Sequence, residues 1–175
     1  MRKNPLRELT FAAMLGGAYA ALTMLLPIPQ YAGVQFRLAE ALTLLPFLIP
    51  AATPGLFVGC FIANILSPYG LLDIIAGSTA TLLACLWTQR MKNCRLAALP
   101  PVVCNAVIVG GVIAFAMTGF GPGFWVAYAI NAASVGVGEF VVCYVLGDLL
   151  LKAVVKIPVF RSMMPAERLV LMKKG

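Results

Sequence analysis

Arg37 and Glu40 are the residues of this chain whose types and spacing most need a chemical explanation. Both lie in the apolar segment of residues 33–50, whose sequence is GVQFRLAEALTLLPFLIP. An ionisable side chain inside hydrocarbon costs roughly 2.5–3.5 kcal/mol on insertion scales, so such residues usually pair or serve a site. Positions three apart share one face of a helix, so Arg37 and Glu40 can either neutralise each other or bind one polar ligand together.

The composition indicates that lipid surrounds this pair. Of the 175 residues, 62% are hydrophobic and 11% are charged, against about 45–50% and about 25% in soluble domains. The mean hydropathy is +0.97. The length suits one domain, residues 1–175, with five to seven spans of about 20 residues each. We therefore expect an all-α integral membrane protein that crosses the cell membrane several times.

Several kinds of chemistry are excluded by residue usage. The net charge is +7, but the basic residues stand at the two ends and in one short internal segment, as in cytoplasmic loops rather than nucleic-acid sites. There is no histidine, the commonest metal ligand and general base. The five cysteines form no C-x-x-C pair, and no G-x-x-x-x-G-K-[ST] phosphate loop occurs. We predict no metal, no cofactor, no enzymatic activity and no nucleic-acid partner.

The start of the chain resembles a signal peptide in its basic residues and its Ala18-Tyr19-Ala20 triplet. The apolar run of residues 9–26 is nevertheless long enough to span, and Glu8 precedes it. We interpret it as a retained first helix that ends at the prolines of residues 27–29.

Small residues follow two stripes on this first helix. Small residues spaced four apart let two helix backbones approach closely, which is the usual basis of helix association in lipid. Packing inside the protein is the alternative, but two full stripes exceed what one internal neighbour needs. We predict a docking surface for another membrane protein, formed by Ala12, Gly16 and Ala20 on one stripe and by Ala13, Gly17 and Ala21 on the other.

Periodicity and proline positions predict six helices, at residues 6–26, 34–49, 54–66, 71–89, 100–117 and 125–155. The second and third are short against a hydrocarbon core of roughly 30 Å. A basic tail begins at about residue 156. Basic residues at the start, after the fourth helix and in the tail all favour the cytoplasm. The three basic segments can all lie on the cytoplasmic side only if the number of spans is even. We therefore expect six spans with both termini in the cytoplasm.

This topology places most of the polar residues in the outer half of the bundle. Asp73 also has a simpler explanation in the helix dipole, and Tyr69 and Trp125 fit an interfacial aromatic belt equally well. Asn105 enters from the other side and is expected to make an interhelical hydrogen bond. Glu139 lies deeper. For the charged residues a binding site is favoured over a structural pair; the candidate substrate-binding residues are Arg37, Glu40, Asn64, Tyr69, Asp73, Trp125, Asn131 and Glu139.

Five blocks carry a family resemblance that extends over nearly the whole chain: VQFRLAEALTLLPFL, PGLFVGCFIAN, DIIAGSTATLLA, PPVVCNAVIVG and NAASVGVGEFVV. Together they resemble the QueT family, the substrate-binding S components of energy-coupling factor (ECF) transporters for queuosine precursors. The resemblance implies capture of a 7-deazaguanine outside, docking on an ECF transmembrane subunit driven by two cytosolic ATPases, and rotation to release the solute. It also implies that the small residues of the first helix face the transmembrane subunit.

The implied ligand matches the polar set. A carboxylate can accept the two adjacent N–H groups of a 7-deazaguanine, and Arg37 or an asparagine can donate to its ring carbonyl. Tyr69, Trp125 or Phe36 could stack on the ring. Three alternatives stay open: an S component for another flat vitamin-like solute, a non-transporting assembly subunit, and an intramembrane enzyme that pairs Glu40 with Asp73 or Glu139.

Overall fold

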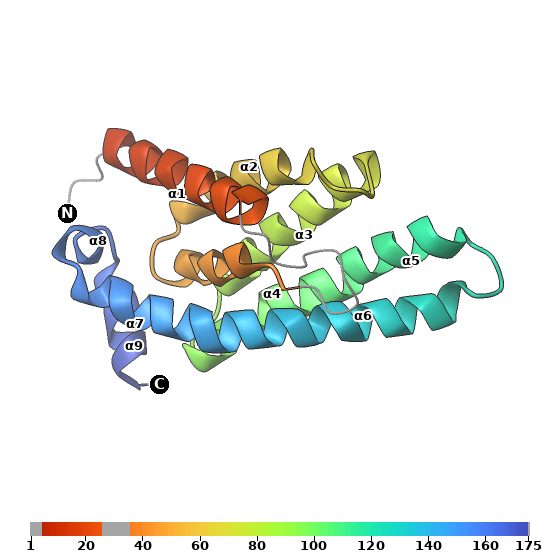
Figure 1. The fold of residues 1–175 in the computed structure, drawn as a ribbon. Coiled ribbons are helices and arrows are strands. Elements are labelled where there is room, and N and C mark those ends of the chain that lie inside the picture. The colour runs from red at the N-terminus through yellow and green to blue at the C-terminus, as the bar shows by residue number, and fades with distance from the viewer. Residues whose placement is uncertain (1–4, 26–35, 175) are drawn as a thin grey trace.

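The structure is a computed structural model that describes residues 5–25 and 36–174, and every regular element in these two ranges is helical. Figure 1 shows a bundle of roughly parallel and antiparallel rods. The elements are α1 (Pro5–Leu25), the 3₁₀ helix η1 (Leu38–Phe47), α2 (Ala52–Asn64), α3 (Leu71–Thr88), the 3₁₀ turn η2 (Arg95–Ala98), α4 (Leu99–Cys104), the π segment η3 (Asn105–Val109), α5 (Gly110–Thr118), α6 (Phe124–Val141), the π segment η4 (Val142–Gly147), α7 (Asp148–Lys156), α8 (Pro158–Arg161) and α9 (Ala166–Lys174).

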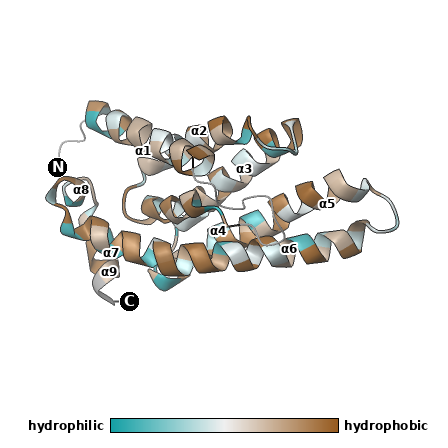
Figure 2. Cartoon of the chain, viewed as in Figure 1, coloured by the Kyte–Doolittle hydropathy of each residue, from teal (hydrophilic) through white to brown (hydrophobic). Residues whose placement is uncertain are grey.

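Four helical runs in the described ranges are long and apolar enough to cross a membrane: Pro5–Leu25, Leu71–Thr88, Arg95–Thr118 and Phe124–Lys156. Figure 2 shows hydrophobic residues along the whole length of α5 and α6. The all-helical membrane class is therefore confirmed. Six spans remain a prediction, because η1 and α2 are short. The proline stop, the end of the first helix at residue 26 and the start of the second at residue 34 lie outside the described residues.

The segment around Arg37 and Glu40 is not the α-helix that we expected. It forms η1, a 3₁₀ helix of ten residues with Pro46 inside it. At about 2.0 Å per residue it is about 20 Å long, against roughly 30 Å of hydrocarbon. In an α-helix the ring of Pro46 would clash with the Leu42 carbonyl, so an α-helix is disfavoured at that end.

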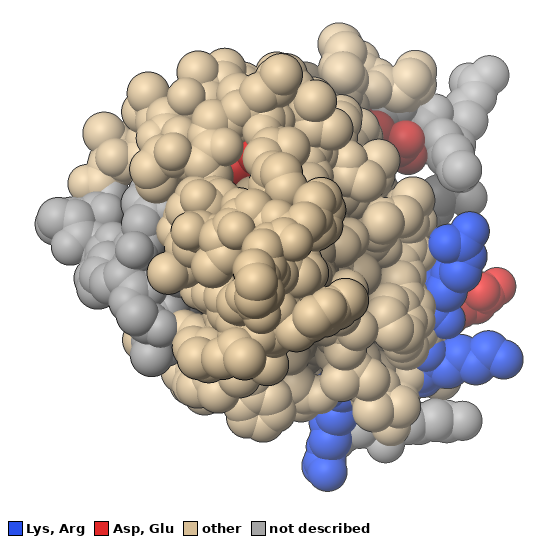
Figure 3. All heavy atoms as spheres, turned by 90° about the vertical axis from the view of Figure 1, so that its right-hand side faces the viewer, with Lys and Arg blue, Asp and Glu red and all other residues tan. Residues whose placement is uncertain are grey.

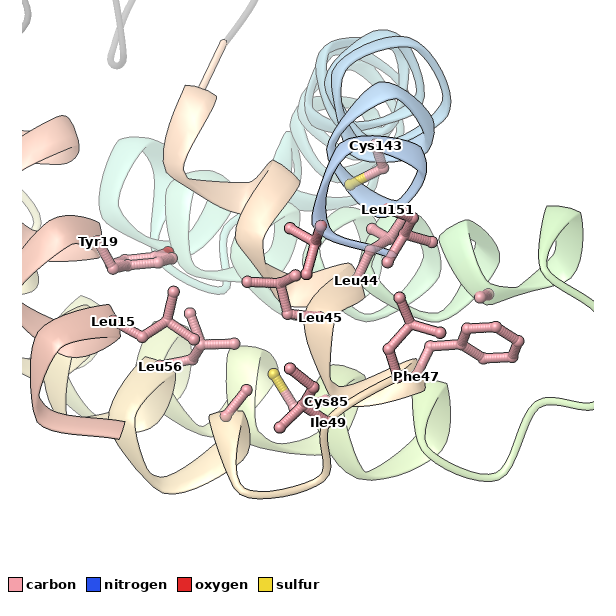
Figure 4. Packing of buried hydrophobic residues seen from close by; sticks show 14 of the residues in the cluster. Leu15, Tyr19, Leu44, Leu45, Phe47, Ile49, Leu56, Cys85, Cys143 and Leu151 are labelled. Atoms are coloured by element: carbon pink, nitrogen blue, oxygen red, sulfur yellow. The ribbon is translucent and has the colours of Figure 1, made fainter. Parts of the chain in front are cut away.

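η1 is the centre of the bundle rather than one of its walls. Eight of its ten residues are buried, and it contacts α1, α2, α3, η4 and α7. A helix that is apolar all round is stable only when other elements enclose it. Figure 4 shows its side chains Leu44, Leu45 and Phe47 inside the apolar core, with Leu15 and Leu56 from α1 and α2 beside them.

Helices α1 and α2 approach so closely that their backbones touch. A Cβ on Gly16 would lie 2.6 Å from the carbonyl oxygen of Gly55, and a Cβ on Gly55 or Gly59 would overlap the backbone of α1. The two predicted stripes therefore differ. Ala12, Gly16 and Ala20 are buried, so this stripe serves an internal contact, whereas the second stripe, Ala13, Gly17 and Ala21, is exposed.

Replacing Gly55 by alanine should destabilise the protein by about 1–3 kcal/mol, because the added methyl group overlaps the Ala12 carbonyl and forces the two helices apart. Gly17→Ala is the matched control, since a Cβ there meets nothing within 4 Å and alanine favours a helix. Thermal unfolding of the purified proteins in detergent measures both. Equal unfolding temperatures for the two variants would contradict the close packing.

The three basic segments meet at one end of the bundle. Arg7 of α1 donates to the Val159 carbonyl at 2.7 Å and to the Ser162 hydroxyl at 2.6 Å. Arg168 of α9 donates to the Met91 carbonyl, just after α3, at 2.8 Å. Figure 3 looks at the opposite end, which consists almost entirely of uncharged residues, with Lys and Arg along one edge. This arrangement agrees with an even number of spans, and the side of the membrane that each end faces remains a prediction.

Candidate functional site

Six polar side chains gather in the interior beside η1, and none is more than 6% exposed. They come from the start of η1 and from α2, α3, η3 and α6. Five of the helical elements must therefore be correctly packed before the group exists. We call it the polar cluster, and its members are Arg37, Glu40, Asn64, Asp73, Asn105 and Glu139.

One half of the polar cluster is organised by Asn64. Its Oδ1 accepts a hydrogen bond from the Arg37 guanidinium, and its Nδ2 donates to the Asp73 carbonyl at 3.1 Å. The Asp73 carboxylate in turn accepts from the Ser67 hydroxyl at 2.6 Å. A side chain on Gly77 would displace this arrangement, because a Cβ there would lie 2.6 Å from Asp73 Oδ1.

The other half joins two carboxylates. The Tyr19 hydroxyl donates to Glu40 Oε1, and Figure 4 shows Tyr19 reaching from α1 toward η1. Asn105 Nδ2 donates to Glu139 Oε1 at 2.9 Å and also interacts with Glu40. Cys143 contacts Glu139 Oε2 at 3.6 Å. The interhelical hydrogen bond expected of Asn105 is thus confirmed, and it links Glu40 to Glu139.

Both π segments lie at this second half of the cluster. η3 begins at Asn105, and η4, which contains Cys143, begins three residues after Glu139. A π turn widens a helix locally and is frequently found at functional sites. Here Asn105 from one wide turn and Cys143 from the other both contact the Glu139 carboxyl group.

Arg37 and Glu40 do not form a direct ion pair. Within the described ranges, Lys152 and Asp148 are the sole oppositely charged side chains with nitrogen and oxygen within 4.0 Å. The Arg37 guanidinium is nevertheless close enough to interact electrostatically with Glu40 and Asp73. The polar cluster thus contains one guanidinium among three carboxyl groups.

Several atoms of this region are buried without a hydrogen-bond partner in the described part of the chain. They are Arg37 Nε, Glu40 Oε2, Asp73 Oδ1 and the Ser78 hydroxyl, which lies on α3 beside Gly77. An unsatisfied buried polar group costs about 1–3 kcal/mol, and more when charged. One donor and two acceptors from charged groups are therefore available to a polar ligand.

Three of the predicted site residues lie elsewhere. Trp125 is 74% exposed and packs against Phe124, with ring centroids 5.2 Å apart, which fits the interfacial belt. Asn131 donates to the Ala127 carbonyl of its own helix at 2.8 Å. Tyr69 is half-buried and packs against a separate apolar cluster of Ala80, Val109, Ile113 and Val135.

Tyr19 is the most important residue that the sequence reasoning missed. It stands among small residues of the first helix, and nothing in their spacing indicated a polar role. Cys60 is buried beside the polar cluster, where its sulfur contacts Asn64 Nδ2 at 3.4 Å and the Thr81 hydroxyl at 3.2 Å. A tyrosine that stands alone beside a stripe of small residues is a weak signal that could have been noticed.

Apolar helices long enough to span a membrane, which enclose a charged and partly unsatisfied interior, define a helical membrane protein with a buried polar cluster. The chain belongs to the QueT transporter family, whose model matches residues 9–156. The search of curated proteins and the search of solved structures found no match. QueT proteins are S components of ECF transporters, so the family resemblance and the absence of an enzymatic role are confirmed.

Proposed function

We propose that this chain binds a 7-deazapurine precursor of queuosine outside the cell and delivers it inward after docking on an ECF transmembrane subunit with two cytosolic ATPases. The observation that carries the proposal is the set of unpaired charged atoms in the polar cluster: Arg37 Nε, Glu40 Oε2 and Asp73 Oδ1. A solute that satisfies them gains charge-assisted hydrogen bonds in a water-poor interior, where such bonds are strongest.

The chemistry of a 7-deazaguanine is complementary to these atoms. Its two adjacent N–H groups suit a carboxylate acceptor, for which Glu40 or Asp73 is available, and its ring carbonyl suits the Arg37 N–H. The polar cluster contains three carboxyl groups and one guanidinium, so its charge also favours a ligand that carries a cation. An aminomethyl-substituted deazaguanine therefore fits better than a neutral one.

Docking is proposed for the exposed stripe Ala13, Gly17 and Ala21. It borders a groove of ≈ 670 Å³ between α1 and α2, whose lining includes Leu9, Pro54 and Val58. Small exposed residues beside a groove allow a partner helix to approach the backbone closely. The Ala12, Gly16 and Ala20 stripe supports this surface from beneath, because it fixes α1 against α2.

Orientation follows from the basic end. Excess Lys and Arg near the ends of spans marks the cytoplasmic side, so we place the end that carries Arg7, Arg90 and Arg168 inside. The α5–α6 turn and the Ser67–Gly70 loop then face outward, as a binding site for an external solute requires.

The decisive experiment measures ligand affinity of the isolated protein by calorimetry. Glu40→Gln and Glu139→Gln should each weaken binding of an aminomethyl-7-deazaguanine about 10- to 100-fold, because a hydrogen bond to a charged group contributes about 1.5–3 kcal/mol. Glu167→Gln on the exposed tail is the matched control and should bind normally.

Unchanged affinity in both Glu40→Gln and Glu139→Gln would contradict the proposed ligand contacts. A loss with Glu139→Gln that is confined to the aminomethyl compound would assign Glu139 to the cation. Guanine and common vitamins in the same screen test for another flat solute, and binding of none of these compounds would favour the assembly-subunit alternative.

A further inference from the structure

A second cavity lies at the basic end of the molecule, away from the polar cluster. Its volume is ≈ 290 Å³, close to the lower end of the roughly 300–1,000 Å³ typical of small-molecule sites. It is formed by η2, η4, α7 and α9, with Leu44 of η1 at its floor. It shares no residue with the polar cluster, although Cys143 lines the cavity and also contacts Glu139.

The lining of this cavity is amphipathic. Leu44, Ala98 and Leu151 are buried apolar residues at its floor, whereas Arg95 and Lys152 are exposed cations at its rim. Asp148 offsets part of this charge, because its carboxylate accepts from Lys152 Nζ at 2.5 Å. Arg95 has no carboxylate within 4.0 Å in the described ranges. The rim therefore keeps a net positive charge above an apolar floor.

The elements around the cavity carry the apolar surface that faces lipid. Leu96 and Leu99 are exposed on η2 and α4, and Val145 and Leu149 are exposed on η4 and α7. These same elements supply the cationic rim, so the cavity lies where hydrocarbon-facing surface meets the basic end. At that level of a bilayer the abundant molecules with a negative charge and an apolar body are anionic phospholipids.

We propose that this cavity binds an anionic phospholipid, with the phosphate on Arg95 and Lys152 and the first part of the acyl chains on the apolar floor. Basic pockets between membrane helices on the cytoplasmic side bind lipid head groups in this way. A free phosphate would share the contact with the cations, but it would leave the apolar floor unused. The inference does not depend on which solute the polar cluster binds.

The test titrates the purified full-length protein, in neutral detergent, with phosphatidylglycerol, phosphatidylcholine or inorganic phosphate, and follows bound lipid by native mass spectrometry. We expect phosphatidylglycerol to bind and the other two to bind much more weakly. Arg95→Gln and Lys152→Gln should each weaken phosphatidylglycerol binding about fivefold, which corresponds to the roughly 1 kcal/mol of one cation near an anionic surface.

Lys156→Gln is the matched control, because Lys156 lies one turn beyond Lys152 on α7 and does not line the cavity. An equal loss with Lys156→Gln would show that only diffuse charge attracts the lipid, and would overturn the site. Equal binding of inorganic phosphate would overturn the lipid as its occupant. Thermal unfolding without lipid checks that each variant is folded, and a loss of binding counts only where the unfolding temperature is unchanged. Arg95→Met, which also removes the cation, replaces Arg95→Gln if that variant fails this check.

Discussion

Replacing Arg37 by glutamine should lower the free energy of unfolding by about 3–5 kcal/mol, the usual cost of removing one partner from buried charges. Arg37 is the sole guanidinium of the polar cluster, where it bonds to Asn64 and interacts with Glu40 and Asp73. Without it, these carboxyl groups lose their stabilising cation in a low-dielectric interior. Solute binding should be lost as well, because Arg37 supplies the available buried N–H of the cluster.

Two further variants separate charge from geometry. Arg37→Lys keeps the charge but not the planar fork that contacts Asn64, so it should recover part of the stability and little of the solute affinity. Arg90→Gln is the surface control, since Arg90 lies just after α3, is exposed and donates to the Leu86 carbonyl of that helix. Thermal unfolding and calorimetry on all three measure the two effects. Wild-type stability in Arg37→Gln would contradict the buried charge network.

Gly17→Leu should abolish solute uptake in cells that contain the complete transporter, while solute binding by the isolated protein stays normal. Gly17 is exposed in the middle of the Ala13, Gly17 and Ala21 stripe, and a Cβ there meets nothing within 4 Å. A leucine is therefore accommodated in the free protein but prevents close approach of a partner helix. Uptake of labelled solute and co-purification of the transmembrane subunit measure the effect.

The matched control is Ala18→Leu, which makes a similar size change at an exposed neighbour about 100° further round α1. It should retain uptake. Equal losses in the two variants would show that the whole exposed face of α1 matters and not the stripe. Loss of solute binding by isolated Gly17→Leu would contradict the docking explanation altogether.

The sequence was informative about features that depend on residue type alone, namely the long apolar helices and the gathering of the buried charged residues. Apolar length predicted the long helices, and the charged residues at the starts of predicted helices, Arg37, Glu40 and Asp73, do lie together. Asn64 joined them because the end of α2 and the start of α3 are connected by a short loop. These inferences need only the order of the elements and the cost of a charge in lipid.

Sequence reasoning was less successful for features that depend on how far along its helix a side chain lies, or on the type of helix that forms. Asn131 and Glu139 share a broad face of α6, but eight residues separate them by about 12 Å along the axis. Figure 1 shows that the α5–α6 hairpin projects beyond α1–α3. Trp125, near the start of α6, is 74% exposed, and Asn131 donates within its own helix. The 3₁₀ form of η1 and the two π segments depend on packing between distant elements, which periodicity does not reveal.

The central position of η1 has a consequence for how the protein is made. Glu40 and Cys143, which contact each other, are 103 residues apart in the chain. At about 5–20 residues per second, roughly 5–20 s pass between synthesis of the first and arrival of the second. During that interval a short apolar segment bearing two ionisable groups lacks the last helix that encloses it. The final packing of η1 must therefore wait until the C-terminal half has been synthesised.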